Sequence, residues 1–109
     1  MATTYKVLGQ SAPAAVTATT LYTVPAATSA VISTINVCNR ATVPDTFRVA
    51  IRPAGATLST SHYVSYDTAV PANDSINITA GISLAATDVV TVYAGTAGLT
   101  FTAFGAEIT

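Results

Sequence analysis

The sequence predicts a single all-β domain, built as an antiparallel two-sheet β-sandwich of about eight strands. Short runs rich in Val, Ile, Thr, Tyr and Phe alternate between apolar and polar residues, the pattern of strands with one buried face. Pro, Gly, Asn or Asp bounds these runs, as is typical of sandwiches and barrels. No window carries apolar residues at three- and four-residue spacing with capping residues, so no helix is predicted. The 109 residues fit one domain, residues 1–109.

The N-terminal half contains four such runs, at residues 4–8, 19–24, 30–39 and 46–52. The third run has apolar residues on both of its faces, so we expect a central strand that is covered on both sides. The fourth run is the clearest. Its alternation predicts that Phe47, Val49 and Ile51 are buried and that Arg48 and Arg52 lie on the opposite face.

The C-terminal half contains the remaining runs, at residues 61–66, 75–79, 82–84, 89–94 and 99–104. The short run 82–84 either continues the run before it or pairs with it. The order in which the strands pair stays open between a jelly-roll and an immunoglobulin-like topology. The chain has no Trp and one Cys, so the Cys–Trp–Cys pattern of a true antibody domain is absent.

Charge is scarce in this chain. Only 8% of the residues are charged and the formal net charge is −1, whereas an average soluble domain has about 25% charged residues. Such a surface repels neighbouring molecules weakly, which favours a subunit that works as a homo-oligomer, a trimer or a dimer. The charge also argues against nucleic-acid binding.

The sequence predicts neither a membrane span nor a targeting segment. No apolar run approaches the ~20 residues that a membrane helix needs. The N-terminal residues lack the basic and long apolar regions of a signal peptide. We therefore expect the chain to be made and folded in a cytoplasm.

The residues that usually carry chemistry are few, and we expect no enzyme, metal or cofactor. One Cys and one His make a transition-metal site improbable, and Cys38, in an apolar run, is predicted to be unpaired and mostly buried. A catalytic triad is permitted by composition alone, through His62, Asp67 and a serine. The aspartates fall in turns, where we expect them to bond their own backbone and not calcium: Asp45, Asp67, Asp74 and Asp88.

Two groups of residues are candidates for a partner interface. Three of the four basic residues fall within one short stretch, which indicates either a solvated outer face or a cationic contact to a partner. A local aromatic group follows, whose tyrosines serve either at an interface or in the core. The candidate residues are Arg40, Arg48 and Arg52 in the first group, and His62, Tyr63 and Tyr66 in the second.

Several blocks of the sequence resemble small virion proteins of tailed bacteriophages, along nearly the full chain. These blocks are LYTVPA at 21–26, INVCNR at 35–40, FRVAIR at 47–52 and ISLAATDVVTVYA at 82–94. The resemblance implies a β-sandwich component of a virion. Its leading interpretation is a capsid decoration (cement) protein that is made in the host bacterial cytoplasm. Such a protein binds the outer surface of the major capsid protein and stabilises the shell.

A second interpretation is a tail, baseplate or fibre module that binds another virion protein or a host glycan. Glycan binding would need an exposed groove lined by aromatic side chains, which Tyr63, Tyr66 and Tyr93 could supply. A small hydrolase is a distant third interpretation.

Overall fold

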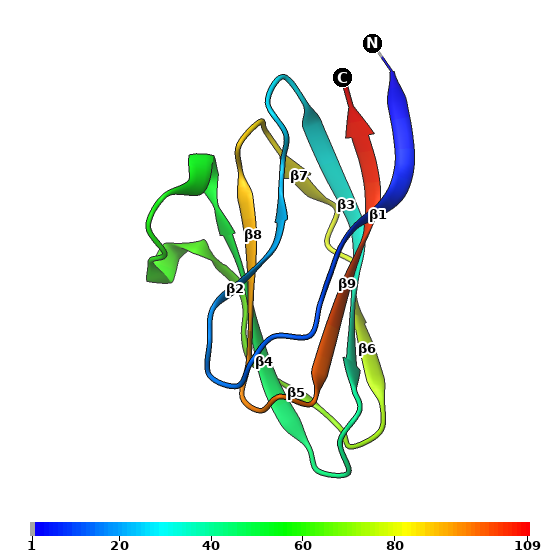
Figure 1. Cartoon of the computed structure of the whole chain (residues 1–109), viewed down its shortest axis with the longest axis vertical. Coiled ribbons are helices and arrows are strands. Elements are labelled where there is room, and N and C mark those ends of the chain that lie inside the picture. Colours follow the sequence, from blue (N-terminus) through cyan, green and yellow to red (C-terminus); the bar gives the residue numbers. More distant parts are fainter. Residues whose placement is uncertain (1) are drawn as a thin grey trace.

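The computed structural model describes residues 2–109, which form two antiparallel sheets (Figure 1). The β9 sheet has the strand order β1-β9-β3-β6, with β7 also pairing with β3; the β8 sheet has the order β2-β8-β4-β5. The strands are β1 (Thr3–Ser11), β2 (Thr19–Thr23), β3 (Ser29–Asn39), β4 (Asp45–Arg52), β5 (Tyr63–Val70), β6 (Ser75–Ile78), β7 (Ile82–Leu84), β8 (Val89–Ala94) and β9 (Leu99–Ile108). The predicted all-β sandwich is confirmed.

The strand order is that of a jelly roll. The first strand pairs with the last, β2 pairs with β8, β3 pairs with β6 and β7, and β4 pairs with β5. This nested pairing, in two four-position sheets, is the double Greek key of jelly-roll domains. The run 82–84 pairs with β3 and not with the run before it, so β6 and β7 together occupy one position of the sheet.

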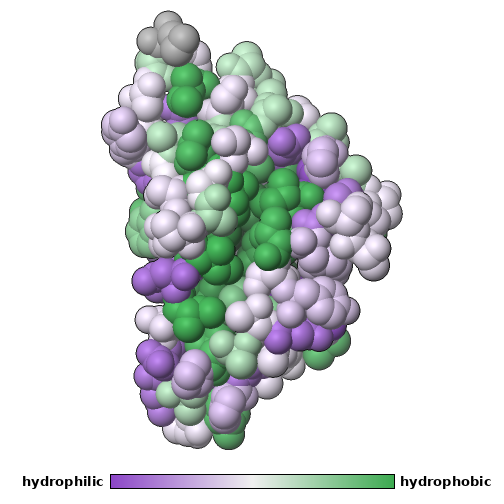
Figure 2. Space-filling model, turned by 180° about the vertical axis from the view of Figure 1, so that it is seen from behind, coloured by the Kyte–Doolittle hydropathy of each residue, from purple (hydrophilic) through white to green (hydrophobic). Residues whose placement is uncertain are grey.

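The core lies between the two sheets and is filled by aliphatic and aromatic side chains. Phe47 of β4 and Phe101 of β9 are fully buried and meet edge to face, with ring centroids 6.0 Å apart. As predicted, Phe47 and Val49 are buried and Arg48 and Arg52 lie on the opposite face of β4, whereas Ile51, expected to be buried, is only half-buried near the end of the strand. At the margins of the core, further apolar side chains are partly buried, and Figure 2 shows an apolar band along the length of the molecule.

The third run forms a central strand, but the expectation that both of its faces are covered is wrong. In β3 the buried apolar residues are Ala30 and Ile32, and then Ile35 and Val37. The pairing of β3 with β9 shifts register between Ile32 and Thr34. A β-bulge of this kind inserts one residue and reverses which alternate positions face the core. The even-numbered residues face the core before the bulge and the odd-numbered residues face it afterwards. Strict alternation along the whole run therefore makes both faces look apolar, although only one face of β3 is buried.

Two other predictions need correction. The fifth strand begins at Tyr63, because residues 60–62 form a 3₁₀ turn, η2 (Thr60–His62). The Nδ1 atom of His62 accepts a hydrogen bond from the backbone N–H of Ser59 at 3.2 Å, which closes this turn. Cys38 is unpaired, as expected, but it is only half-buried, because the bulge in β3 places it on the outer face of the strand.

Candidate partner-binding site

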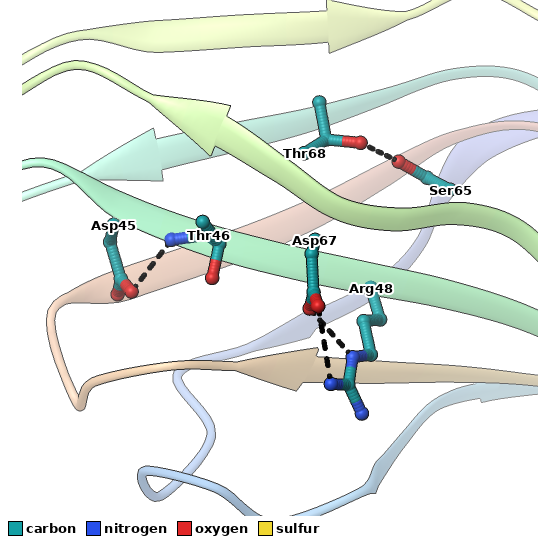
Figure 3. Close-up of polar contacts among 6 residues, drawn as sticks. All are labelled: Asp45, Thr46, Arg48, Ser65, Asp67 and Thr68. Atoms are coloured by element: carbon teal, nitrogen blue, oxygen red, sulfur yellow. Dashed lines mark hydrogen bonds and ion pairs between the residues drawn. The ribbon is translucent and has the colours of Figure 1, made fainter.

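Arg48 lies at the centre of an aromatic group on the outer face of the β8 sheet. It projects from β4 beside Tyr93 of β8, its direct neighbour in the register. Its Nε donates a hydrogen bond to Oδ1 of Asp67 at 2.8 Å (Figure 3). The carbon of its guanidinium group lies 4.2 Å from the ring centroid of Tyr66 and 4.4 Å from that of Tyr93. The cation is thus held between two aromatic rings, where cation–π attraction is favourable.

An irregular stretch of β5 brings its residues to Arg48. The pairing of β4 with β5 shifts register between Phe47 and Val49, and Asp67 adopts a left-handed backbone with φ of 49°. This bulge re-aims the side chains of the edge strand. Tyr66 also meets Tyr63 edge to face, with ring centroids 4.9 Å apart. We call Arg48, Tyr63, Tyr66, Asp67 and Tyr93 the arginine–tyrosine cluster.

The cluster presents aromatic surface and not a free positive charge. The hydrogen bond with Asp67 raises the pKa of Arg48 above its ordinary value, so the guanidinium stays charged and paired. About a quarter of the Arg48 side chain is exposed, whereas Tyr66 is 56% exposed. An open pocket adjoins the cluster and is lined by Leu58, Ser59, Thr60, Tyr63 and Tyr66. A partner would meet tyrosine rings and hydroxyl groups first.

The three arginines do not form one site. Arg52 bonds to the turn that follows its own strand, with Nε 2.7 Å from the carbonyl oxygen of Ala56 and Nη2 3.1 Å from that of Gly55. Arg40 lies in the loop after β3, at the end of the other sheet, where its side chain bonds to Oγ1 of Thr100 at 2.8 Å and to the carbonyl oxygen of Ala97. Only Arg48 joins the tyrosines that the sequence singled out. Each arginine has acceptors within the chain.

The sequence interpretation missed Asp67 as the partner of Arg48. Asp74 does bond the backbone N–H that follows it, at 2.7 Å, as expected of a turn aspartate. Asp45 bonds the next N–H in the same way and also reaches Thr96, 51 residues away (Figure 3 shows the local bond). The ion pair of Asp67 depends on the bulge in β5 and has no local sequence signal.

A second surface of interest lies on the outer face of the β9 sheet. Four large apolar side chains are exposed there, from three neighbouring strands: Tyr5, Val7, Val31 and Phe104. Tyr5, Val31 and Phe104, together with Ala106 and Ile108, line a shallow apolar depression, which Lys6 borders. This face has apolar character without any of the candidate residues that the sequence indicated.

Within residues 2–109, no three His, Cys, Asp or Glu side chains gather as a metal site would require. The same part of the chain contains no helix that is long and apolar enough to cross a membrane. Comparison of the sequence with protein-family models and with curated proteins gave no match.

Proposed function

We propose that this chain is a non-enzymatic structural protein of a virion, a capsid decoration protein that binds the outer surface of the major capsid protein. The observation that carries the proposal is the arginine–tyrosine cluster, a half-exposed aromatic surface fixed on a rigid sheet. Tyrosine and arginine are the residues most often found at the energetic centre of protein interfaces. In a chain with few charges, this surface is the best candidate for the contact.

The fold and the sequence blocks support the same function. Viral capsid domains and lectins both use the jelly roll, although this is an analogy of fold and not of function. The blocks that resemble phage virion proteins include strand β4, which carries Arg48, and strand β8, which carries Tyr93. The chain is expected to be made in the host bacterial cytoplasm and to act as a homo-oligomer.

The mechanism is stabilisation by mass action. A protein that binds the assembled lattice, but not free capsid subunits, shifts the equilibrium toward the lattice. In this role Arg48 is a positioning residue, because Asp67 and the two rings already satisfy it. It fixes the orientation of Tyr66 and Tyr93, so that little side-chain entropy is lost when the partner binds.

The test is binding of the purified chain to capsids that lack the decoration protein. We expect Tyr66→Ala to weaken binding at least about tenfold, as loss of a tyrosine at the energetic centre of an interface does. Its thermal midpoint should stay close to that of the wild type, because Tyr66 is exposed. The matched control is Val64→Ala, an exposed residue of the same strand, which should bind normally. Unchanged binding by Tyr66→Ala would contradict the proposal.

A second candidate function is glycan binding by a tail, baseplate or fibre module. Support for this alternative comes from Tyr66 and Tyr93, which lie against Arg48, and from Tyr63, which packs edge to face on Tyr66. The adjoining pocket is also lined by Ser59 and Thr60. Aromatic faces and hydroxyl groups are suited to sugars. Titration with host surface glycans, compared between wild type and Tyr66→Ala, tests this alternative. The copy number in purified particles separates the two, since hundreds of copies indicate cement and a handful indicates a tail component.

A further inference from the structure

Strand β1 has an open edge that the rest of the fold does not cover. It is the outermost strand of its sheet (Figure 1), and residues 3–7 are all exposed. Ala2 and Thr109 exchange both of their backbone hydrogen bonds at 2.9 Å. Because hydrogen-bonded pairs alternate along an antiparallel ladder, Thr4 and Lys6 also bond to β9. The N–H and C=O groups of Thr3, Tyr5 and Val7 therefore point to the open edge.

The other edges of the sandwich carry the features that normally prevent pairing with another chain. Strand β5 has two register shifts and a left-handed residue, and β6 and β7 are only four and three residues long. Strand β2 has five residues and a register shift, and Gly9 of β1 lies against the carbonyl group of its Leu21. Bulges and short strands are common protections of sheet edges. Residues 3–7 of β1 have no bulge, and their one charged side chain, Lys6, is paired with Glu107 of the same sheet.

We propose that a second copy of this chain pairs with β1, antiparallel and across a two-fold axis that passes through the Tyr5 pair. In this register Tyr5 faces Tyr5 of the other copy, and Thr3 faces Val7. All three residues present free N–H and C=O groups, so the two edges exchange six backbone hydrogen bonds. The two β9 sheets then form one continuous sheet. This inference goes beyond capsid binding and does not depend on it.

Charge complementarity selects this register and favours a second copy. Lys6 is the one charged residue of β1, and its ammonium group lies 2.8 Å from Glu107 of β9. A two-fold axis at Lys6 would place two lysines directly opposite each other, which is destabilising. An axis at Tyr5 places Lys6 of each copy opposite Thr4 of the other copy. Thr4 pairs with Glu107 within its own chain, so Lys6 lies in the same cross-strand row as Glu107 of the other copy. An axis at Thr4 would use only two of the three open positions in each strand.

The outer face of the β9 sheet is consistent with the same register. Tyr5 lies beside Ala106, which lies beside Val31, and this row continues into its symmetry copy through the Tyr5 pair. The neighbouring row joins Phe104 and Val7 of one copy to Thr3 and Ile108 of the other. Tyr5 is 84% exposed in the single chain, and pairing would cover part of its ring. The apolar side chains of the two copies would thus form one uncharged surface.

The first experiment measures the mass of the full chain by sedimentation velocity over a concentration series. We expect the wild type to dimerise. We expect Tyr5→Pro to raise the dissociation constant at least about tenfold, because proline removes the N–H of both central hydrogen bonds. That N–H does not bond to β9, so circular dichroism should show a folded protein. Tyr5→Val, which keeps the N–H, is the matched control and should still dimerise.

The second experiment tests the register by cross-linking, in a Cys38→Ser background. Directly opposite residues of a hydrogen-bonded pair have Cα atoms about 5.5 Å apart, within the range of a disulfide. Tyr5→Cys should therefore form a covalent dimer on oxidation. Thr3→Cys and Val7→Cys should cross-link with each other when mixed but not alone. A wild type that stays monomeric, or Thr3→Cys dimers without Tyr5→Cys dimers, would overturn the proposal.

Discussion

At the scale of single residues, Glu107 joins three strands across both sheets. Its Oε1 lies 2.8 Å from Nζ of Lys6 on β1, and its Oε2 accepts a hydrogen bond of 2.6 Å from the hydroxyl group of Tyr22 on β2. These hydrogen bonds, first that of Lys6 and then that of Tyr22, lower the pKa of Glu107 below its ordinary value of 4.5. Burial, with a smaller effect of Glu107, raises the pKa of the Tyr22 hydroxyl group.

The lowered pKa of Glu107 predicts a dependence of stability on pH. The folded state binds this proton less readily than the unfolded chain does. The contribution of the carboxylate to the free energy of unfolding is therefore complete above the unfolded value, near 4.5, and is lost as the pH falls through the lower folded value. Glu107→Gln lacks this contribution. Urea unfolding at pH 7 and pH 3 should show a larger loss for the wild type than for Glu107→Gln.

The other carboxylates are common to both proteins, so they cancel in this comparison. Equal losses of stability for the wild type and for Glu107→Gln would show that Glu107 titrates alike in the folded and unfolded chains.

At the scale of elements, bulges decide what each strand buries. Register shifts occur in β1 between Val7 and Gly9, in β3 between Ile32 and Thr34, and in the pairing of β4 with β5. A glycine lies at two of these register shifts, Gly9 in β1 and Gly105 opposite Ile32 of β3, because the backbone of a neighbouring strand approaches closely there. A Cβ atom on Gly9 would lie 2.1 Å from the carbonyl oxygen of Leu21, and one on Gly105 would lie 2.0 Å from that of Val31.

The close approach at Gly105 predicts that even a methyl group disrupts the pairing of β3 with β9. Gly105→Ala should lower the free energy of unfolding by about 1–3 kcal/mol, the usual range for overpacking. Thr102→Ala, on the outer face of the same strand, should change it by less than about 0.5 kcal/mol. Urea denaturation measures both. If Gly105→Ala is as stable as the wild type, then β3 and β9 can move apart at this position without a loss of stability, and the prediction is wrong.

At the scale of the whole molecule, the two sheets are held together by a core that spans them. Phe47 comes from the β8 sheet and Phe101 from the β9 sheet, and both are fully buried. In the nested pairing, the first strand lies beside the last and β2 lies beside β8. Most contacts therefore join segments that are far apart in the chain. The stability of a domain of this size is about 5–15 kcal/mol, so one large cavity in the core removes much of it.

Two phenylalanines of β9 allow a direct test of this dependence. Phe101→Ala should lower the free energy of unfolding by about 3–5 kcal/mol, because it leaves a cavity between the sheets. Phe104→Ala removes the same side chain from the outer face, where Phe104 is 41% exposed. In dilute solution it should change the stability by less than about 0.5 kcal/mol. Chemical denaturation compares the two; equal losses would contradict the assignment of the core.

The sequence alone determined the class of the fold and the position of nearly every strand. Alternation is a local property, because neighbouring residues of a strand point to opposite faces. It therefore located β4 with Phe47 inward and Arg48 outward. It could not show that the face reverses within β3, because a bulge depends on the partner strand. It also placed residues 61 and 62 in a strand, although they form a turn that the side chain of His62 closes.

Only the tertiary structure decided which strands pair and which distant residues meet. The sequence was compatible with jelly-roll and immunoglobulin-like orders, and long-range packing selected the former. Arg40 and Arg48 are near in sequence, but Arg40 follows β3 and bonds to Thr100 of the β9 sheet, whereas Arg48 lies on β4 of the β8 sheet, because the chain passes from one sheet to the other between them. Arg48 instead meets Asp67 and Tyr93, which reach it through a bulge in β5 and the register of β8. Local alternation indicates which residues face inward within an unbroken stretch of strand. Pairing between distant strands decides where a bulge reverses that face and which residues become neighbours.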